Sequence, residues 1–160
     1  MVGPLVTDAP AAFAEALPEG GVLLALDLGT KTIGISTCDA GWRYATAGKT
    51  IARGKFGKDR VTLQGLISNR SVTGIVIGLP RNMDGSEGPR AQASRAYARN
   101  LAEAFGLPVL LWDERWSTAS AEAAMIGQDM SRAKRSERID SHAAAVILQG
   151  AIDRLAGAAF

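Results

Sequence analysis

The order of its apolar segments is the feature of this sequence that most limits the fold. Residues 22–29, VLLALDLG, form an apolar run of strand type, and residues 32–39, TIGISTCD, follow after a turn that contains Gly29. Two such runs joined by a glycine turn predict a β-hairpin. Residues 42–51, WRYATAGKTI, predict a third antiparallel strand. The predicted core therefore starts with three antiparallel strands.

After residue 52 the pattern changes to alternating helices and strands. The expected elements are helices over 58–68, 89–104, 118–125 and 139–155, and strands over 72–80 and 107–114. Right-handed crossovers would place the two later strands parallel to each other in the same sheet. The prediction is an α/β fold: a mixed five-stranded sheet, three strands antiparallel and then two parallel, flanked by helices. This is the layout of an RNase H-like domain.

Composition narrows the class of protein. With 160 residues, of which 47% are hydrophobic and 21% charged, the chain predicts one globular domain over residues 21–157. Residues 1–20 contain three prolines and are expected to be a weakly structured extension. They lack the pattern of a signal peptide, and no apolar run is long enough to cross a bilayer. A cytoplasmic location without a membrane partner is therefore expected.

The counts of cysteine, histidine and charge restrict possible sites. One cysteine and one histidine, Cys38 and His142, argue against a disulfide framework and against a metal site rich in sulfur or nitrogen. Any metal would be held by oxygen. The formal net charge is only +2, so nucleic-acid binding would require a local basic patch.

Asp27 is the carboxylate of the first predicted strand. Alternation along a strand puts it on the same face as Leu23 and Ala25, the face expected to be buried. An isolated buried carboxylate is costly. Asp27 therefore either caps the glycine turn that follows it or binds a cation.

Carboxylates from two other segments could reach the same place. Asp113 and Glu114 end the last predicted strand, at the edge where sites in α/β sheets usually lie, and which of the two points inward stays open. Asp140 shares a helical stripe with alanines, which let a helix approach the sheet closely. Converging carboxylates repel one another unless a cation intervenes, and oxygen ligands favour Mg²⁺ or Mn²⁺. Two such ions about 4 Å apart can drive phosphodiester hydrolysis.

Each of these carboxylates also has an ordinary structural explanation. Asp140 could cap the start of its helix. Glu114 could form a surface ion pair with Arg115 or Arg132. The metal-binding interpretation depends on Asp27, Glu114 and Asp140 acting together.

Basic residues gather at several places near these carboxylates. Residues 131–138, SRAKRSER, are expected to form a loop, and the candidates there for phosphate contacts are Arg132, Lys134 and Arg135. A solvated linker explains the same composition. Pro89 suits the first turn of a helix whose free N–H groups could bind a phosphate, although an ordinary capping loop is an equal alternative. The further candidates for nucleic-acid binding are Lys31, Arg90 and Arg115.

Four segments together resemble the YqgF family of RNase H-like proteins. They are ALDLGTKTIGIS (25–36), GLPRNMDGSEGPRA (78–91), WDERWSTASAE (112–122) and IDSHAAAVIL (139–148). The resemblance implies metal-dependent hydrolysis of phosphodiester bonds, with Asp27, Glu114 and Asp140 as catalytic residues and ligands of two Mg²⁺ or Mn²⁺ ions. It also implies a role in maturing the 5′ end of 16S ribosomal RNA from its precursor. The N-terminal extension and Trp116 depart from the family pattern.

Three other functions stay open. A resolvase that cuts branched DNA of the Holliday-junction type would be expected to work as a homodimer. A nucleic-acid-binding protein without catalysis would carry the same basic residues. The turn DLGTKTIG also resembles the first phosphate loop of actin-like and sugar-kinase-like ATPases, but these need a second domain and a second phosphate loop that the sequence does not offer.

Overall fold

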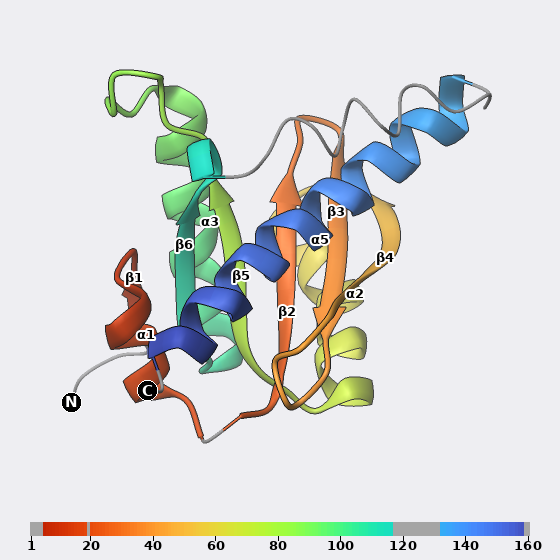
Figure 1. Ribbon diagram of the computed structural model, residues 1–160. Coiled ribbons are helices and arrows are strands. Elements are labelled where there is room, and N and C mark those ends of the chain that lie inside the picture. Colours follow the sequence, from red (N-terminus) through yellow and green to blue (C-terminus); the bar gives the residue numbers. More distant parts are fainter. Residues whose placement is uncertain (1–4, 19, 117–131, 159–160) are drawn as a thin grey trace.

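A computed structural model describes residues 5–18, 20–116 and 132–158, with side chains for all of these except residues 116, 132–141 and 158. The strands are β1 (Val6–Thr7), β2 (Val22–Leu28), β3 (Thr32–Cys38), β4 (Ala45–Ala52), β5 (Val72–Leu79) and β6 (Val109–Asp113). They form one sheet in the spatial order β1-β6-β5-β2-β3-β4 (Figure 1). The predicted mixed sheet is confirmed, with one strand more than expected.

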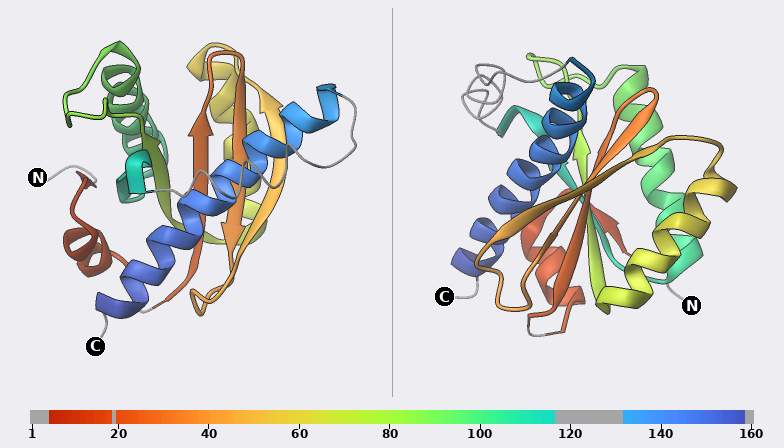
Figure 2. Two further views of the ribbon diagram at one scale, coloured as in Figure 1. Left: turned by 45° about the horizontal axis from the view of Figure 1, so that its top comes forward. Right: turned by 90° about the vertical axis from the view of Figure 1, so that its right-hand side faces the viewer.

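The helices lie on both faces of this sheet. They are α1 (Pro10–Ala16), α2 (Phe56–Arg70), α3 (Pro89–Phe105) and α5 (Arg132–Ala158), with one 3₁₀ turn, η1 (Glu114–Trp116). α5 crosses one face diagonally, and α2 and α3 cover the other face (Figures 1 and 2). Among the described helices none is both long and apolar enough to span a bilayer.

The antiparallel half of the sheet follows the predicted hairpin. β2 pairs with β3 in a register that sets Leu26 opposite Ile35, and the Gly29 N–H donates a 2.9 Å hydrogen bond to the Thr32 carbonyl at the turn. β4 pairs with β3, while β5 and β6 add on the other side of β2 in the parallel sense. The predicted helix over 118–125 lies outside the described residues.

The N-terminal segment is part of the fold, so the expectation of a weakly structured extension is wrong for residues 5–17. β1 pairs in parallel with β6 and becomes the sixth strand. Pro10 is the first residue of α1, a position where its missing N–H is no loss. Phe13 of α1 is fully buried against Gly74, where an added Cβ would lie only 2.9 Å from the Phe13 ring.

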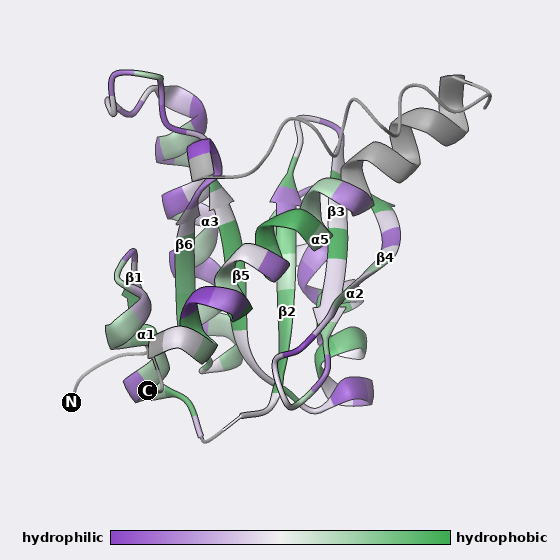
Figure 3. Ribbon diagram, viewed as in Figure 1, coloured by the Kyte–Doolittle hydropathy of each residue, from purple (hydrophilic) through white to green (hydrophobic). Residues whose placement is uncertain are grey.

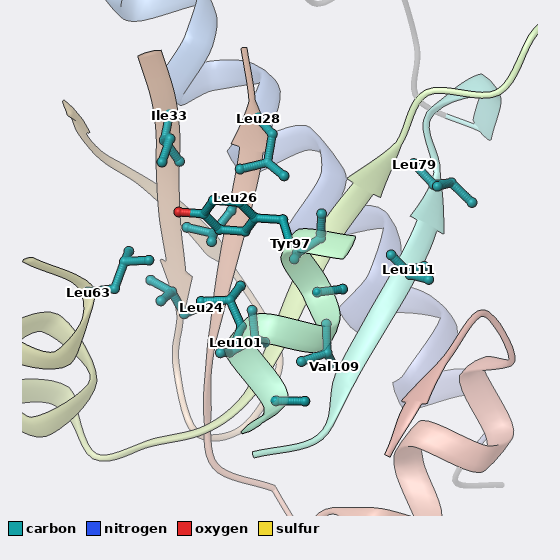
Figure 4. Packing of buried hydrophobic residues seen from close by; sticks show 14 of the residues in the cluster. Leu24, Leu26, Leu28, Ile33, Leu63, Leu79, Tyr97, Leu101, Val109 and Leu111 are labelled. Atoms are coloured by element: carbon teal, nitrogen blue, oxygen red, sulfur yellow. The ribbon is translucent and has the colours of Figure 1, made fainter. Parts of the chain in front are cut away.

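Alternation along β2 divides the core into two layers. Leu24, Leu26 and Leu28 pack with residues of α2 and α3, and Figure 4 shows Tyr97 and Leu101 of α3 lying against them. Leu23 and Ala25 pack on the other side with α1 and α5. The strands are accordingly the most hydrophobic part of the molecule, whereas the segment between β5 and α3 is largely hydrophilic (Figure 3). We call these two sides the α3 face and the α5 face.

Candidate functional site

Asp27 lies on the α5 face near the C-terminal end of β2, as alternation predicts. Its partner on β3 is Gly34. On the other side Leu26 pairs with Ile77 of β5, so the next position brings Asp27 beside Gly78. Both neighbours of Asp27 on the sheet are therefore glycines, so no side chain projects from the strands on either side of its carboxylate. Such a place lets another group approach the strands closely.

Glu114 fills the space that Gly78 leaves. It is the first residue of η1, directly after β6. A Cβ built on Gly78 would lie 2.5 Å from Glu114 Oε1 and 3.1 Å from its Cγ, so the side chain lies directly over this glycine. Since Gly74, Val76 and Gly78 alternate with the α3-face residues of β5, this position belongs to the α5 face. Glu114 and Asp27 therefore share one face, with Gly78 of β5 between the strands that carry them.

Gly78 gives Glu114 its space, a role for which the sequence analysis did not single it out. The sequence contains a signal for this role. A glycine inside the strand IVIGLP weakens the strand, and it often marks a place where another group approaches the backbone closely. Any larger residue would displace the Glu114 carboxylate or Ile147 of α5, whose Cδ1 lies 2.8 Å from the same built Cβ.

Asp113 lies on the α3 face, the side of the sheet opposite to that of Asp27 and Glu114. Its side chain is buried, and Asp113 Oδ2 lies 2.7 Å from Arg115 Nη2 and 3.4 Å from Arg81 Nη1. The Arg115 backbone N–H also donates to Asp113 Oδ1 at 2.9 Å. Hydrogen bonds from the Arg115 side chain hold the pKa of Asp113 below its usual value despite burial. Asp113 therefore anchors the turn from which Glu114 projects.

The pairing with Asp113 limits one candidate for nucleic-acid binding. Arg115 forms an ion pair with Asp113. Its Nη1 also donates to the Met83 carbonyl at 3.4 Å. The Arg115 guanidinium is exposed, but much of its charge is already matched by Asp113. Its binding to nucleic acid stays a prediction.

α5 begins at Arg132, so the expectation of a basic loop over residues 131–138 is wrong from residue 132 onward. The backbone of Asp140 lies in this helix, one turn before Ala144. The Ala144 carbonyl accepts a 2.8 Å hydrogen bond from Ser36 Oγ of β3, which fixes this part of α5 on the sheet. The side chains of Arg132, Lys134, Arg135 and Asp140 lie outside the described residues, and their roles stay predictions.

The described part of the site offers a metal ion two carboxylates, from Asp27 and Glu114. Within the described side chains no group of three or more potential metal ligands occurs. The donor set, oxygen only and negatively charged, fits Mg²⁺ or Mn²⁺. A third ligand would have to come from a residue such as Asp140.

Lys31 and Arg90 lie at the end of the sheet where Asp27 is. Lys31 is exposed in the turn between β2 and β3. Arg90, the second residue of α3, donates from Nη2 to the Leu28 carbonyl at 3.4 Å. Both side chains therefore flank the residues that follow Asp27.

Comparison with solved structures supports the assignment of the fold. The chain is similar to Thermus thermophilus RuvC in complex with Holliday junction substrate, with a TM-score of 0.54 and 14% identity over 86% of this chain and 96% of that one. It is also similar to Ydc2, the yeast mitochondrial Holliday junction resolvase, with a TM-score of 0.51 and 14% identity over 94% of this chain and 85% of that one. These similarities show an RNase H-like fold of the kind that such resolvases have.

Sequence comparison identifies the family. Residues 21–154 match the RuvX family, described as Holliday junction resolvase, and the chain belongs to this family. The resemblance to YqgF proteins is thereby confirmed. A relative from Novosphingobium aromaticivorans is 63% identical over 98% of this chain and all of its own length. One from Sphingopyxis alaskensis is 61% identical over 94% of this chain and 99% of its own. Both carry the name "Putative pre-16S rRNA nuclease".

Proposed function

We propose that this protein is a metal-dependent nuclease that hydrolyses phosphodiester bonds during 5′-end maturation of precursor 16S ribosomal RNA, in the cytoplasm. The observation that carries the proposal is the Glu114 carboxylate, which lies over Gly78 on the same face as Asp27. Two carboxylates that converge on one face of the sheet repel each other unless a cation lies between or beside them. The substrate is the one named for relatives that match this chain over their whole length.

Asp27 and Glu114, with Asp140 as the third ligand, would hold Mg²⁺ or Mn²⁺. When bound, such ions activate a water molecule and stabilise the leaving oxygen of a phosphodiester. The protein residues supply the oxygen ligands and their orientation. Gly34 and Gly78 leave room beside Asp27, and the Asp113–Arg115 ion pair holds the turn that directs Glu114 toward the α5 face. Catalysis depends on such fixed positions, because small displacements of a ligand reduce the rate.

The basic residues would bind the nucleic acid. Lys31 and Arg90 flank the end of β2. Arg132, Lys134 and Arg135 lie in the first turns of α5, the helix that crosses the face of Asp27. Contacts between such side chains and phosphates give affinity without sequence preference.

A second candidate function is cleavage of branched DNA by a homodimer. It is favoured by the description of the matching family and by the similarity in fold to two resolvases. The same carboxylates would serve, and only the shape of the bound nucleic acid would differ.

An assay with several substrates tests these proposals. The purified protein is incubated with labelled precursor 16S RNA, unrelated single-stranded RNA and a four-way DNA junction, with Mn²⁺ or with chelator. We expect Mn²⁺-dependent cleavage of the precursor near the mature 5′ end. The Glu114→Gln variant, purified in parallel, controls for a contaminating nuclease. Cleavage of the junction alone would favour the resolvase. Binding without cleavage of any substrate would contradict both enzymatic functions.

A further inference from the structure

A second site lies at the same end of β2 as Asp27, on the α3 face. A cavity of about 200 Å³ opens between the turn after β2 and the first turns of α3. Its polar lining consists of Thr30, Arg53, Arg90 and Ser94. The volume is below the roughly 300 Å³ at which pockets begin to enclose a drug-sized ligand. The cavity therefore suits a small group, not a whole nucleotide.

Two arginines give this cavity a positive wall. Arg53 Nη1 donates a 2.6 Å hydrogen bond to the Gly29 carbonyl, and the Arg53 guanidinium lies 5.3 Å from the centre of the Tyr97 ring. Arg90 is held more loosely by the Leu28 carbonyl. Neither arginine forms an ion pair with a carboxylate anywhere in the described chain, unlike Arg81, Arg95 and Arg115. Two like charges around one small cavity favour binding of an anion.

The start of α3 adds a further attraction for negative charge. This 17-residue helix begins at Pro89, and no side chain caps its first N–H groups. The amino end of a helix carries partial positive charge and free N–H donors, which suit a phosphate.

Ser94 adds a hydroxyl group to the lining of the cavity. The residue is only 4% exposed, and its hydroxyl forms no hydrogen bond among the described residues. A phosphate oxygen in the cavity would accept a hydrogen bond from it.

We propose that this cavity binds one backbone phosphate of the nucleic-acid strand on which the active site acts. The assignment of the phosphate to this nucleic-acid strand, the strand assignment, rests on the proposed function. The preference for a phosphate follows from the cavity itself. Because Leu28 directly follows Asp27, a strand that runs across the end of β2 would meet both sites. The cavity would hold the strand beside the bond to be cut and contribute to its alignment.

Binding measured without cleavage tests this proposal. Affinity for labelled single-stranded RNA is determined in chelator at several salt concentrations, for the wild type and for Arg90→Ala, Ser94→Ala and Arg99→Ala. Arg99→Ala is the matched control, since Arg99 is exposed on the same helix and does not line the cavity. We expect Arg90→Ala to weaken binding about tenfold at low salt and to reduce the salt slope by about 0.7. Ser94→Ala should weaken it about threefold without loss of folding stability.

A second arm separates a strand phosphate from free phosphate. Inorganic phosphate is titrated while the amide NMR signals of Thr30, Arg90 and Ser94 are followed. Shifts that saturate in the wild type and disappear in Arg90→Ala support the cavity as an anion site. If these shifts occur but RNA affinity is equal in Arg90→Ala and Arg99→Ala, the strand assignment is overturned. If phosphate shifts none of these amides, or the wild type fails to bind RNA, the proposal is overturned as well. Loss of cleavage alone would contradict the proposed nuclease function and leave the binding result intact.

Discussion

Two consecutive carboxylates, one on each face of the sheet, have opposite electrostatic surroundings. On the α3 face Asp113 is enclosed by Arg81 and Arg115, which match its charge within the fold. On the α5 face Glu114, the next residue, lies over Gly78 near a second carboxylate, Asp27. Arginines that match the charge of a carboxylate make it part of the fold, whereas a carboxylate near a second acid is a candidate for binding a cation.

The largest effects are expected from the two carboxylates of the α5 face. Asp27→Asn and Glu114→Gln each remove a negative oxygen ligand, so the rate of Mn²⁺-dependent cleavage should fall about a hundredfold or more. Melting temperatures without metal should be unchanged or higher, because repulsion between the acids is relieved. Glu103→Gln, at an exposed position of α3, is the matched control. Near wild-type cleavage by either site variant would contradict the assignment of that residue.

Gly78→Ala should disrupt the site on the α5 face by displacing the Glu114 carboxylate. The new Cβ would meet Glu114 Oε1 at 2.5 Å and Ile147 Cδ1 at 2.8 Å. We expect cleavage to fall about tenfold to a hundredfold, because ligands must stay close to their productive geometry. Stability should fall by about 1–3 kcal/mol from overpacking. Rates and urea unfolding measure the two effects.

The control for that substitution is Gly65→Ala in α2, where an added Cβ meets nothing within 4 Å. It should raise stability by about 0.4–1 kcal/mol and leave cleavage unchanged. If both alanine variants behaved alike, Gly78 would have no particular role in placing Glu114.

Asp113→Asn tests the role of the carboxylate on the α3 face. The substitution leaves Arg115 and Arg81 without their buried carboxylate, so the free energy of unfolding should fall by about 1.5–3 kcal/mol. Cleavage should fall only about tenfold, since Asp113 acts through the turn that orients Glu114. The metal concentration for half-maximal rate should change little. A loss of cleavage as large as that of Glu114→Gln, with stability unchanged, would instead indicate that Asp113 is a ligand.

The smallest effect is expected from pH. Hydrogen bonds from Arg95, and then from Arg81, lower the pKa of Glu87 from 4.5 to about 2. A carboxyl group whose pKa is lower in the folded state contributes stability above its unfolded pKa and loses it as the pH falls. The contribution of Glu87 should therefore be complete above about pH 4.5 and decline toward pH 2.

Thermal melts between pH 2 and pH 7 measure this contribution. The Glu87 side chain is 24% exposed, so solvent screening should keep its effect near 1 kcal/mol, or roughly 2–4 °C. Glu87→Gln should be less stable than the wild type at pH 7 and should approach it at pH 2. An equal difference at both ends of the range would show that packing, and not charge, makes the contribution.

Local patterns were sufficient for most of the fold. Alternation in VLLALDLG predicted that Asp27 shares a face with Leu23 and Ala25, and the glycine turn predicted the hairpin. Helix–strand alternation predicted the parallel half. The prediction failed for residues 5–17, because β1 has only two residues and pairs with Val109 and Leu110, about a hundred positions away. The start of α5 was also misplaced, because a run of basic residues is compatible with both a loop and a helix.

What the sequence by itself determined is the face of each residue within a regular strand, since that depends only on a period of two. Which of Asp113 and Glu114 shares the face of Asp27 was decided by the tertiary structure. The strand ends at Asp113, periodicity ends with it, and the direction of Glu114 depends on the ion pair of Asp113 with Arg115 and on the space above Gly78. Contacts between residues far apart in the chain have no local signature, so only the folded molecule brings the acids, the glycines and the arginines of this end of the sheet together.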